Sequence, residues 1–245
     1  MSVTYQRHGL VAVVTIDRPR RRNAIDRATA HALGEAWTTF EADDEARVGV
    51  LFGAGGVFSA GADLKSFDLV DDDEGPLGFT RRWSSKPTIA AIEGYCVAGG
   101  LEMALWCDLR VADKGAVFGC FERRFGVPLI DGGTQRLPRL IGLSRALDMI
   151  LTGRPVEAEE ALAIGLANRV VPVGQALTAA IRLAESIASF PQPTLLADRQ
   201  AAVEGFGLAM LEALALERRL GSPNLEAASE GAARFAAGEG RQGTF

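Results

Sequence analysis

KPTIAAIEGYCVAGGLEMALWCDLRVA, residues 86–112, is the stretch of sequence that decides the fold. TIAAI at its start is short, apolar and rich in β-branched residues, which is typical of a buried strand. The glycines of GYCVAGG predict a turn, LEMALWC predicts a buried helix, and residues 109–112 predict a further strand. Glu102 lies in that apolar helix. Burial of a carboxylate is unfavourable, so its presence there indicates a chemical or structural role.

The same plan of strand, glycine-rich turn and helix occurs upstream in residues 48–64. VGVLF predicts the strand, and GAGGVFSAGADL predicts a turn that leads into a short helix. Further strands are expected at residues 10–17 and 116–119, and a helix from Asp26 to Ala46. Residues 69–78 are acidic and contain Gly and Pro, which indicates a surface loop. Strands that alternate with helices predict an α/β chain.

The chain becomes helical after about residue 143. We expect a helix capped by Ser144, one long helix over residues 194–220, and a last helix over 223–237. This pattern predicts two parts, an α/β core of residues 1–190 that carries the site and a helical region of residues 191–245. The apolar faces of the terminal helices must be covered by the core or by a neighbouring subunit.

Composition excludes several classes of protein. The 245 residues are 48% hydrophobic and 23% charged, as in an ordinary soluble protein, and the net charge of -5 disfavours nucleic-acid binding. Three cysteines without a C-x-x-C pair and only two histidines argue against a disulfide scaffold, a zinc module and a histidine-dependent catalytic triad. The sequence contains no Walker A loop. The N-terminus lacks the pattern of a signal peptide, and we expect a cytoplasmic protein without a membrane partner.

Two glycine turns and two acids are candidates for chemistry. The amides of Ala62 and Gly99, each expected at a helix start, can together form an oxyanion hole for a thioester or ester enolate; otherwise the glycines only permit tight turns. Glu102 and Glu122 can hold a water and divide the roles of base and acid. The alternatives are that Glu122 pairs with a neighbouring arginine and that Glu102 bonds to backbone.

At these residues the sequence resembles the enoyl-CoA hydratase/isomerase (crotonase) superfamily. The resemblance follows the chain in order, through RPRRRNAID, FSAGADLK, the stretch of residues 86–112, FGCFE, GGTQRLPRLIG and LTGRPVEAEEALAIGLANRVV. It implies a spiral of ββα units with a helical C-terminal region, assembled as trimers or hexamers, with residues 191–245 as the trimerisation region.

The resemblance also implies an activity, the reversible addition of water to a trans-2-enoyl-CoA to give a 3-hydroxyacyl-CoA, which is a lyase reaction of fatty acid metabolism. Ala62 and Gly99 match the two amides that hold the thioester oxygen. Glu102 matches the acid that helps to deprotonate the water, and Glu122 matches the acid associated with proton delivery. Coenzyme A belongs to the substrate, and neither a further cofactor nor a metal is implied. The substrate-binding residues expected from the resemblance are Arg22, Ala24, Ala60, Ala62, Asp63, Leu64, Lys65, Gly99 and Ile130.

Two features depart from the usual hydratase pattern. Leu129-Ile130-Asp131 replaces a loop that often carries proline and glycine, so Ile130 is placed to narrow the pocket. Asp131 is expected either to be structural, for example by capping the next helix, or to serve as the acid of an isomerase. The segment 66–85 is short, which leaves the acyl-chain preference open. Isomerisation, dehydration of another acyl-CoA, and non-catalytic acyl-CoA binding are the alternative functions.

Overall fold

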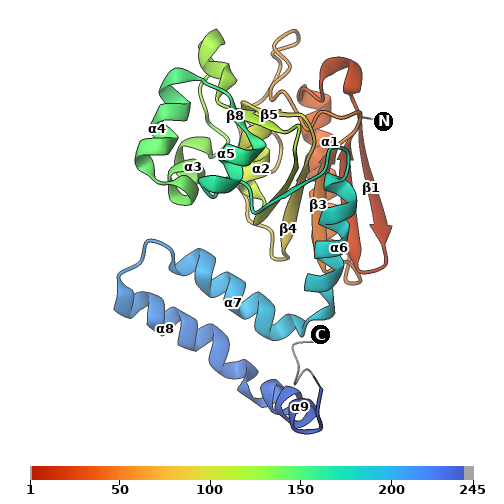
Figure 1. Cartoon of the computed structure of the whole chain (residues 1–245), viewed down its shortest axis with the longest axis vertical. Helices are drawn as coiled ribbons and strands as arrows, with labels where there is room; N and C mark the ends of the chain where they lie inside the picture. The colour runs from red at the N-terminus through yellow and green to blue at the C-terminus, as the bar shows by residue number, and fades with distance from the viewer. Residues whose placement is uncertain (1, 240–245) are drawn as a thin grey trace. The chain divides into compact units, whose positions relative to one another are not determined.

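The structure, a computed structural model, describes residues 2–239, except for the side chain of Ala227. The chain divides into two compact units, residues 1–188 and 189–245, close to the division predicted after residue 190 (Figure 1).

The first unit is built on a six-stranded sheet. The strands lie in the order β1-β2-β3-β4-β6-β9, and all neighbours are parallel except β1 and β2. β1, which the sequence analysis did not predict, forms a hairpin with β2. The strands are β1 (Val3–His8), β2 (Val11–Ile16), β3 (Val48–Gly53), β4 (Thr88–Ile92), β6 (Leu109–Asp113) and β9 (Arg169–Val171).

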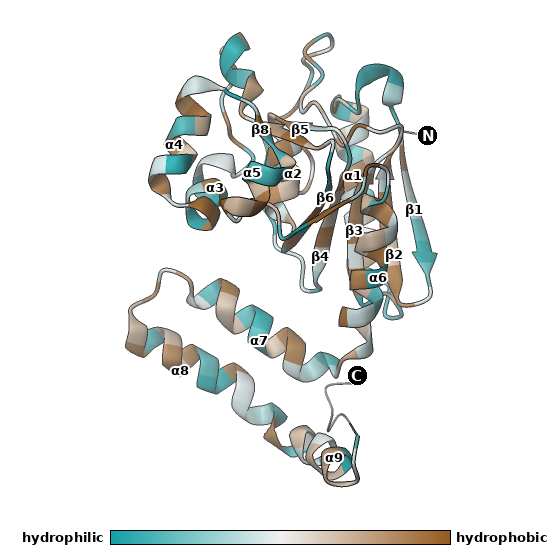
Figure 2. Ribbon diagram, viewed as in Figure 1, coloured by the Kyte–Doolittle hydropathy of each residue, from teal (hydrophilic) through white to brown (hydrophobic). Residues whose placement is uncertain are grey.

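Both faces of the sheet are buried at its central strands, β2, β3 and β4. Val11 and Val13 of β2 belong to a core shared with α6 (Ala176–Ser189), while Ala12 and Val14 belong to the larger core with α1 (Arg27–Ala42). β2, β3 and β4 therefore consist almost entirely of apolar residues, which Figure 2 shows mainly in brown. The helix predicted from Asp26 to Ala46 is confirmed as α1, with Asp26 as its N-cap.

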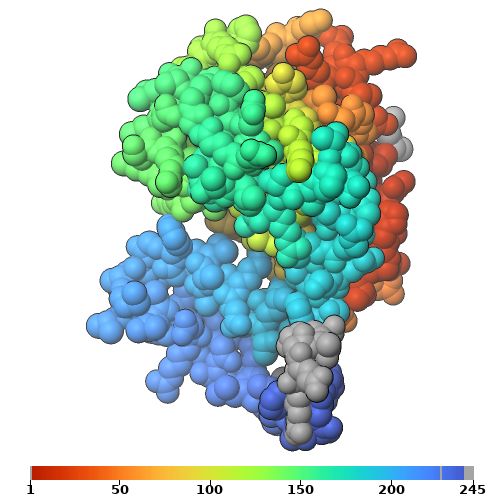
Figure 3. Space-filling model, in the orientation of Figure 1, coloured from red at the N-terminus to blue at the C-terminus, as the bar shows by residue number. Residues whose placement is uncertain are grey.

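A three-stranded sheet and short helices complete the first unit. The order strand, strand, helix occurs as β4, β5, α2 and again as β6, β7, α3, which confirms the expected ββα units. α3 and α4 lie on one flank of this unit (green in Figure 3). The remaining elements are η1 (Pro19–Arg21), β5 (Tyr95–Val97), α2 (Gly99–Trp106), β7 (Val117–Gly119), η2 (Phe121–Phe125), α3 (Gly133–Ile141), α4 (Leu143–Thr152), β8 (Val156–Glu157) and α5 (Ala158–Ala163).

Three local predictions for this unit were wrong. In residues 54–87, all of them described, no helix follows the SAGAD turn, because the segment bridges instead to Ile25 and Cys96. α4 begins after Gly142 and is not capped by Ser144. The acidic loop is on the surface only in part, since its end turns inward and Leu77 is buried.

The second unit consists of helices. The single helix predicted over residues 194–220 is wrong, because the chain breaks between α7 and α8, where Gly207 has φ +101°. Phe206, Met210 and Leu211 are exposed in the isolated chain, and trimerisation through residues 191–245 stays a prediction. No helix within residues 2–239 has the length and apolar character needed to cross a bilayer. The elements are α7 (Gln192–Gly205), α8 (Met210–Gly221), η3 (Ser222–Asn224) and α9 (Leu225–Ala236).

Candidate active site

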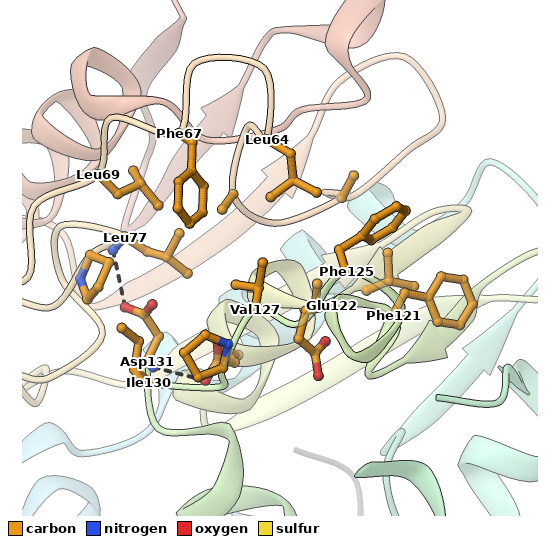
Figure 4. Close-up of a pocket in the computed structure, with 18 of the residues that line it drawn as sticks. Leu64, Phe67, Leu69, Leu77, Phe121, Glu122, Phe125, Val127, Ile130 and Asp131 are labelled. Atoms are coloured by element: carbon orange, nitrogen blue, oxygen red, sulfur yellow. Dashed lines mark hydrogen bonds between the residues drawn. The ribbon is translucent and has the colours of Figure 1, made fainter. Parts of the chain in front are cut away.

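A cavity of about 770 Å³ in the first unit contains most of the residues proposed from the sequence. Its walls come from the segment after η1, the loop after β3, the start of α2, and η2 with the loop that follows it (Figure 4). The predicted residues that line it are Arg22, Ala60, Ala62, Leu64, Lys65, Gly99, Glu102, Glu122 and Ile130.

Two predicted substrate-binding residues, Ala24 and Asp63, are buried and do not line the cavity. The Ala24 carbonyl accepts a hydrogen bond from the Arg18 guanidinium. One carboxylate oxygen of Asp63 pairs with the same guanidinium at 3.3 Å, and the other accepts from the Lys65 amide at 3.1 Å. Both residues therefore hold the turns beneath the cavity.

The segment that carries Ala62 is fixed from two sides by backbone hydrogen bonds. On one side the Ala60 amide donates to the Arg22 carbonyl at 3.0 Å; on the other side the Ser59 amide donates to the Tyr95 carbonyl at the same distance. Extended backbone on both sides explains why no helix begins here. The Ala62 amide itself has no acceptor among the described residues.

The Ala62 segment and the start of α2 approach each other closely. A Cβ atom added to Gly61, which has φ +82°, would lie 2.5 Å from the amide nitrogen of Gly99. Ala98 has φ +54°, an unfavourable backbone for a residue with a side chain, and it turns the chain sharply into α2. Gly99 is the first residue of α2, so its amide has no partner within the helix. Ala62 and Gly99 thus both line the cavity, on two backbone segments in close contact, which is the arrangement expected of an oxyanion hole.

Glu102 is held in the same wall of the cavity by backbone amides. Its side chain comes from α2, its residue is 3% exposed, and Oε1 accepts hydrogen bonds from the amides of Asp131 at 2.9 Å and Gly133 at 2.8 Å. The prediction that Glu102 bonds to backbone is therefore correct. These bonds do not prevent a catalytic role, because both are made by Oε1. Among the described hydrogen bonds, none involves Oε2.

Glu122 lies at the start of η2 and is as deeply buried, at 5% exposure. Within residues 2–239, neither of its carboxylate oxygens has a hydrogen-bond partner. The neighbouring arginines are engaged elsewhere, Arg123 with the Ile150 carbonyl and Arg124 with the Gly153 carbonyl and the ring of Phe121. Because buried polar groups in proteins are nearly always partnered, this carboxylate is oriented for something that enters the cavity.

Burial shifts the protonation of both glutamates. It raises the pKa of Glu102 to about 8, a rise opposed by the amide hydrogen bonds and increased by the charges of Asp131 and Glu122. Burial likewise raises the pKa of Glu122, opposed by the proximity of its own backbone amide and by the charge of Arg123. Two acids that influence each other titrate as a pair, and near neutral pH the pair retains a proton.

Asp131 is the third buried acid of the cavity, and the structure corrects its expected role as a helix cap. α3 follows Gly132 and has no side-chain cap. Asp131 Oδ1 instead accepts hydrogen bonds from the Leu77 amide, at 3.1 Å, and from the Thr80 hydroxyl. It thereby joins the loop after β3 to the loop before α3, a long-range link that no local sequence pattern indicates.

Asn23 is a positioning residue that the sequence analysis missed. Its side chain is fully buried and donates to the carbonyls of Ala54 at 2.9 Å and Val57 at 2.6 Å, while it accepts from the Arg18 amide at 2.8 Å. These bonds fix the turn around Asn23. Ile25, two residues further along, pairs with the Ala62 segment. The only signal in the sequence was an asparagine between charged and apolar residues.

Three cations lie on the wall of the cavity, namely Arg22, Lys65 and Arg124. Guanidinium and ammonium groups bind phosphate through charge-assisted hydrogen bonds. A ligand with phosphates and a polarised carbonyl would therefore find partners for both groups within one cavity.

Comparison with known proteins identifies the family of this chain. Residues 6–244 match the family model described as enoyl-CoA hydratase/isomerase. The chain belongs to this family. A probable enoyl-CoA hydratase of Rhizobium meliloti is 38% identical over 86% of this chain and 85% of its own length. A carnitinyl-CoA dehydratase of Salmonella paratyphi A is 40% identical over 76% of this chain and 74% of its own length.

Solved structures of the enoyl-CoA hydratase/isomerase family share the fold. The crystal structure of enoyl-CoA hydratase EchA1 from Mycobacterium marinum superposes with a TM-score of 0.91 at 38% identity, and the match covers 96% of each chain. An enoyl-CoA hydratase from Mycobacterium tuberculosis also gives a TM-score of 0.91, at 37% identity. The resemblance inferred from the sequence motifs and the crotonase-like fold are thus both confirmed.

Proposed function

We propose that this chain is an enoyl-CoA hydratase, which adds water reversibly across the double bond of a trans-2-enoyl-CoA. The observation that carries the proposal is Glu122, a buried carboxylate that has no hydrogen-bond partner among residues 2–239 and that lines the same cavity as Glu102, Ala62 and Gly99. The relatives named enoyl-CoA hydratase support it.

The geometry supports a sequence of steps. The amides of Ala62 and Gly99 bind the thioester oxygen and stabilise the enolate that forms when water attacks C3. A carboxylate of the Glu102–Glu122 pair takes one proton from the water, the hydroxide part bonds to C3, and the protonated acid of the pair donates a proton to C2. The pair therefore works with one proton and one negative charge.

The sequence analysis gave water deprotonation to Glu102 and proton delivery to Glu122. Burial raises the pKa of both acids, that of Glu102 to about 8, so the pair as a whole holds the shared proton near neutral pH. We therefore assign the first proton abstraction to the pair as a unit, with both residues indispensable. Arg22, Lys65 and Arg124 would hold the phosphates of coenzyme A.

The test follows the absorbance of the conjugated enoyl thioester of crotonyl-CoA. Wild type should remove it and give a product heavier by one water, while Glu102→Gln and Glu122→Gln should each lower kcat by about 10² or more. A product of unchanged mass would show an isomerase. Binding of crotonyl-CoA without turnover would show a non-catalytic acyl-CoA-binding protein. Either result would overturn the proposal.

A further inference from the structure

One end of the cavity is lined mainly by apolar side chains and holds one buried carboxylate, that of Asp131, with the exposed carboxylate of Asp71 nearby. Leu69, Leu77 and Ile130 line this end together with Asp131, and Figure 4 shows the four residues gathered apart from Phe121 and Phe125. Asp131 is 4% exposed. Figure 4 also shows one of its oxygens joined to the Leu77 amide.

The second oxygen of Asp131, Oδ2, has no hydrogen-bond partner among the described residues, since both bonds to the carboxylate use Oδ1. Cations are close at hand, but they are used by other groups. The Arg81 guanidinium binds Asp71 at 2.6 Å and the Ile130 carbonyl at 3.1 Å. Arg136 donates to the carbonyls of Asp131, at 2.9 Å, and Thr80, at 2.6 Å.

This end adjoins the place where the acyl chain would extend. The Leu77 side chain is 3.1 Å from the position that a Cβ on Gly99 would occupy, and the backbone amide of Asp131 donates to Glu102. Leu77 thus contacts both ends of this region: its side chain lies beside Gly99, and its backbone amide binds the Asp131 carboxylate. Negative charge at this end disfavours phosphate groups, which are drawn to Arg22 and Lys65. The acyl chain therefore runs towards Asp131.

We propose that Asp131 determines acyl specificity, with Oδ2 accepting a hydrogen bond from a hydroxyl or ammonium group carried by the acyl chain of the substrate. The inference rests on the proposed hydratase function. A plain hydrocarbon tail would remove water from this carboxylate without replacing its hydrogen bond, which is unfavourable. A chain with a donor at the right distance replaces that bond.

The test compares 2-hexenoyl-CoA with its 5-hydroxy, 6-hydroxy and 6-amino derivatives. Wild type should show a kcat/KM at least about tenfold higher for one of the polar substrates, because a site built to bind a polar group rejects the analogue that lacks it. Preference for the amino compound alone would indicate a cationic substrate, and preference for a hydroxy compound would indicate a neutral one. Each result supports the proposal.

Two variants locate the effect. Asp131→Asn keeps an acceptor for Leu77 and Thr80 but replaces the free oxygen by an amide donor, so the preference for the amino substrate should vanish. Asp131→Ala removes both oxygens, so the preference for hydroxy substrates should also vanish, with folding checked by thermal melting. The control is Asp68→Asn, since Asp68 accepts a hydrogen bond from the Arg27 amide and is not among the lining residues. It should keep the wild-type ratio.

The outcome separates this inference from the proposed function. If wild type hydrates all four substrates equally, or prefers 2-hexenoyl-CoA, the role of Asp131 is refuted while the hydratase function stands. If none is hydrated and crotonyl-CoA is not hydrated either, the hydratase function fails. In that case, calorimetry with hexanoyl-CoA and 6-hydroxy- and 6-aminohexanoyl-CoA still decides the specificity. Equal affinities would refute it, and tighter binding of a polar compound, lost in Asp131→Ala, would confirm it.

Discussion

Glu102 Oε1 accepts a hydrogen bond from the Gly133 amide at 2.8 Å, so the carboxylate on α2 is tied to the first residue of α3. The two residues are in such close contact that a Cβ on Gly133 would lie 2.9 Å from that oxygen and 3.0 Å from Cγ of Glu102. The position of the Glu102 carboxylate is thus set by Gly133, a residue that has no side chain.

Gly133→Ala should lower kcat for crotonyl-CoA by about 10- to 100-fold, because the added methyl group displaces a carboxylate whose geometry the reaction needs. Steady-state kinetics measure the effect. Gly221→Ala is the matched control, since Gly221 ends α8 and a Cβ there meets nothing within 4 Å. Equal kcat in Gly133→Ala and wild type would show that Glu102 is not positioned in this way.

Glu102→Gln should stabilise the fold at alkaline pH while it removes activity. The pKa of Glu102 is raised in the folded chain to about 8, so the folded state favours the protonated acid, and ionisation costs stability as the pH rises from about 4.5 towards 8. One pKa unit corresponds to ~1.4 kcal/mol, so a rise from 4.5 to about 8 should make the gain in stability of the variant about 5 kcal/mol larger at pH 8.5 than at pH 4. Urea unfolding at the two pH values measures this gain. A gain that does not depend on pH would contradict the shifted pKa.

The pH profile of kcat/KM should be bell-shaped. Activity requires one proton on the Glu102–Glu122 pair, so it falls on the acid side as the second carboxylate is protonated and on the alkaline side as the shared proton is lost. The alkaline limb should lie near pH 8, the raised pKa of Glu102. Rates of crotonyl-CoA hydration from pH 5 to 10 measure the profile, and a constant rate between pH 7 and 10 would exclude the mechanism.

Gly61→Ala should abolish the oxyanion site. The residue has φ +82°, and its new Cβ would lie 2.5 Å from the Gly99 amide nitrogen, so the two amide donors must separate. Loss of one such donor costs about 10²–10³ in kcat. The assay is crotonyl-CoA hydration, with Gly56→Ala as control, because Gly56 also has positive φ but open space around its Cβ position. A variant with near wild-type kcat would place the thioester oxygen elsewhere.

Asn23→Ala should cost about 2–4 kcal/mol of unfolding free energy, since it leaves two part-buried carbonyls and one part-buried amide without their hydrogen-bond partner. Urea unfolding measures it. Asn224→Ala is the control, because Asn224 makes a single part-buried bond to the Leu220 carbonyl, at 3.2 Å, and should lose less than about 1 kcal/mol. Similar losses in the two variants would show that the turn does not depend on Asn23.

The sequence by itself determined the parts of this protein that follow from local pattern. The apolar strands at 48–52 and 88–92, the stripe of Leu33, Trp37 and Phe40 on α1, and the glycine turn before α2 were all predictable, because each depends on the spacing of neighbouring residues. The motifs around Glu102 and Glu122 indicated the family for the same reason. They could not show that the two acids share one cavity.

Only the tertiary structure decided how distant segments meet. The SAGAD turn is extended rather than helical because segments on both sides of it supply backbone partners. Leu77 is buried because its own amide and the hydroxyl of Thr80, in the same loop, both bind the buried Asp131 carboxylate. Among residues 2–239, both oxygens of Glu122 are buried without a hydrogen-bond partner, and the contacts to Leu77 and Thr80 engage Asp131 through Oδ1. These four features depend on burial and on hydrogen bonds between residues far apart in the sequence. The spacing of residues within a short stretch of chain cannot predict either of them.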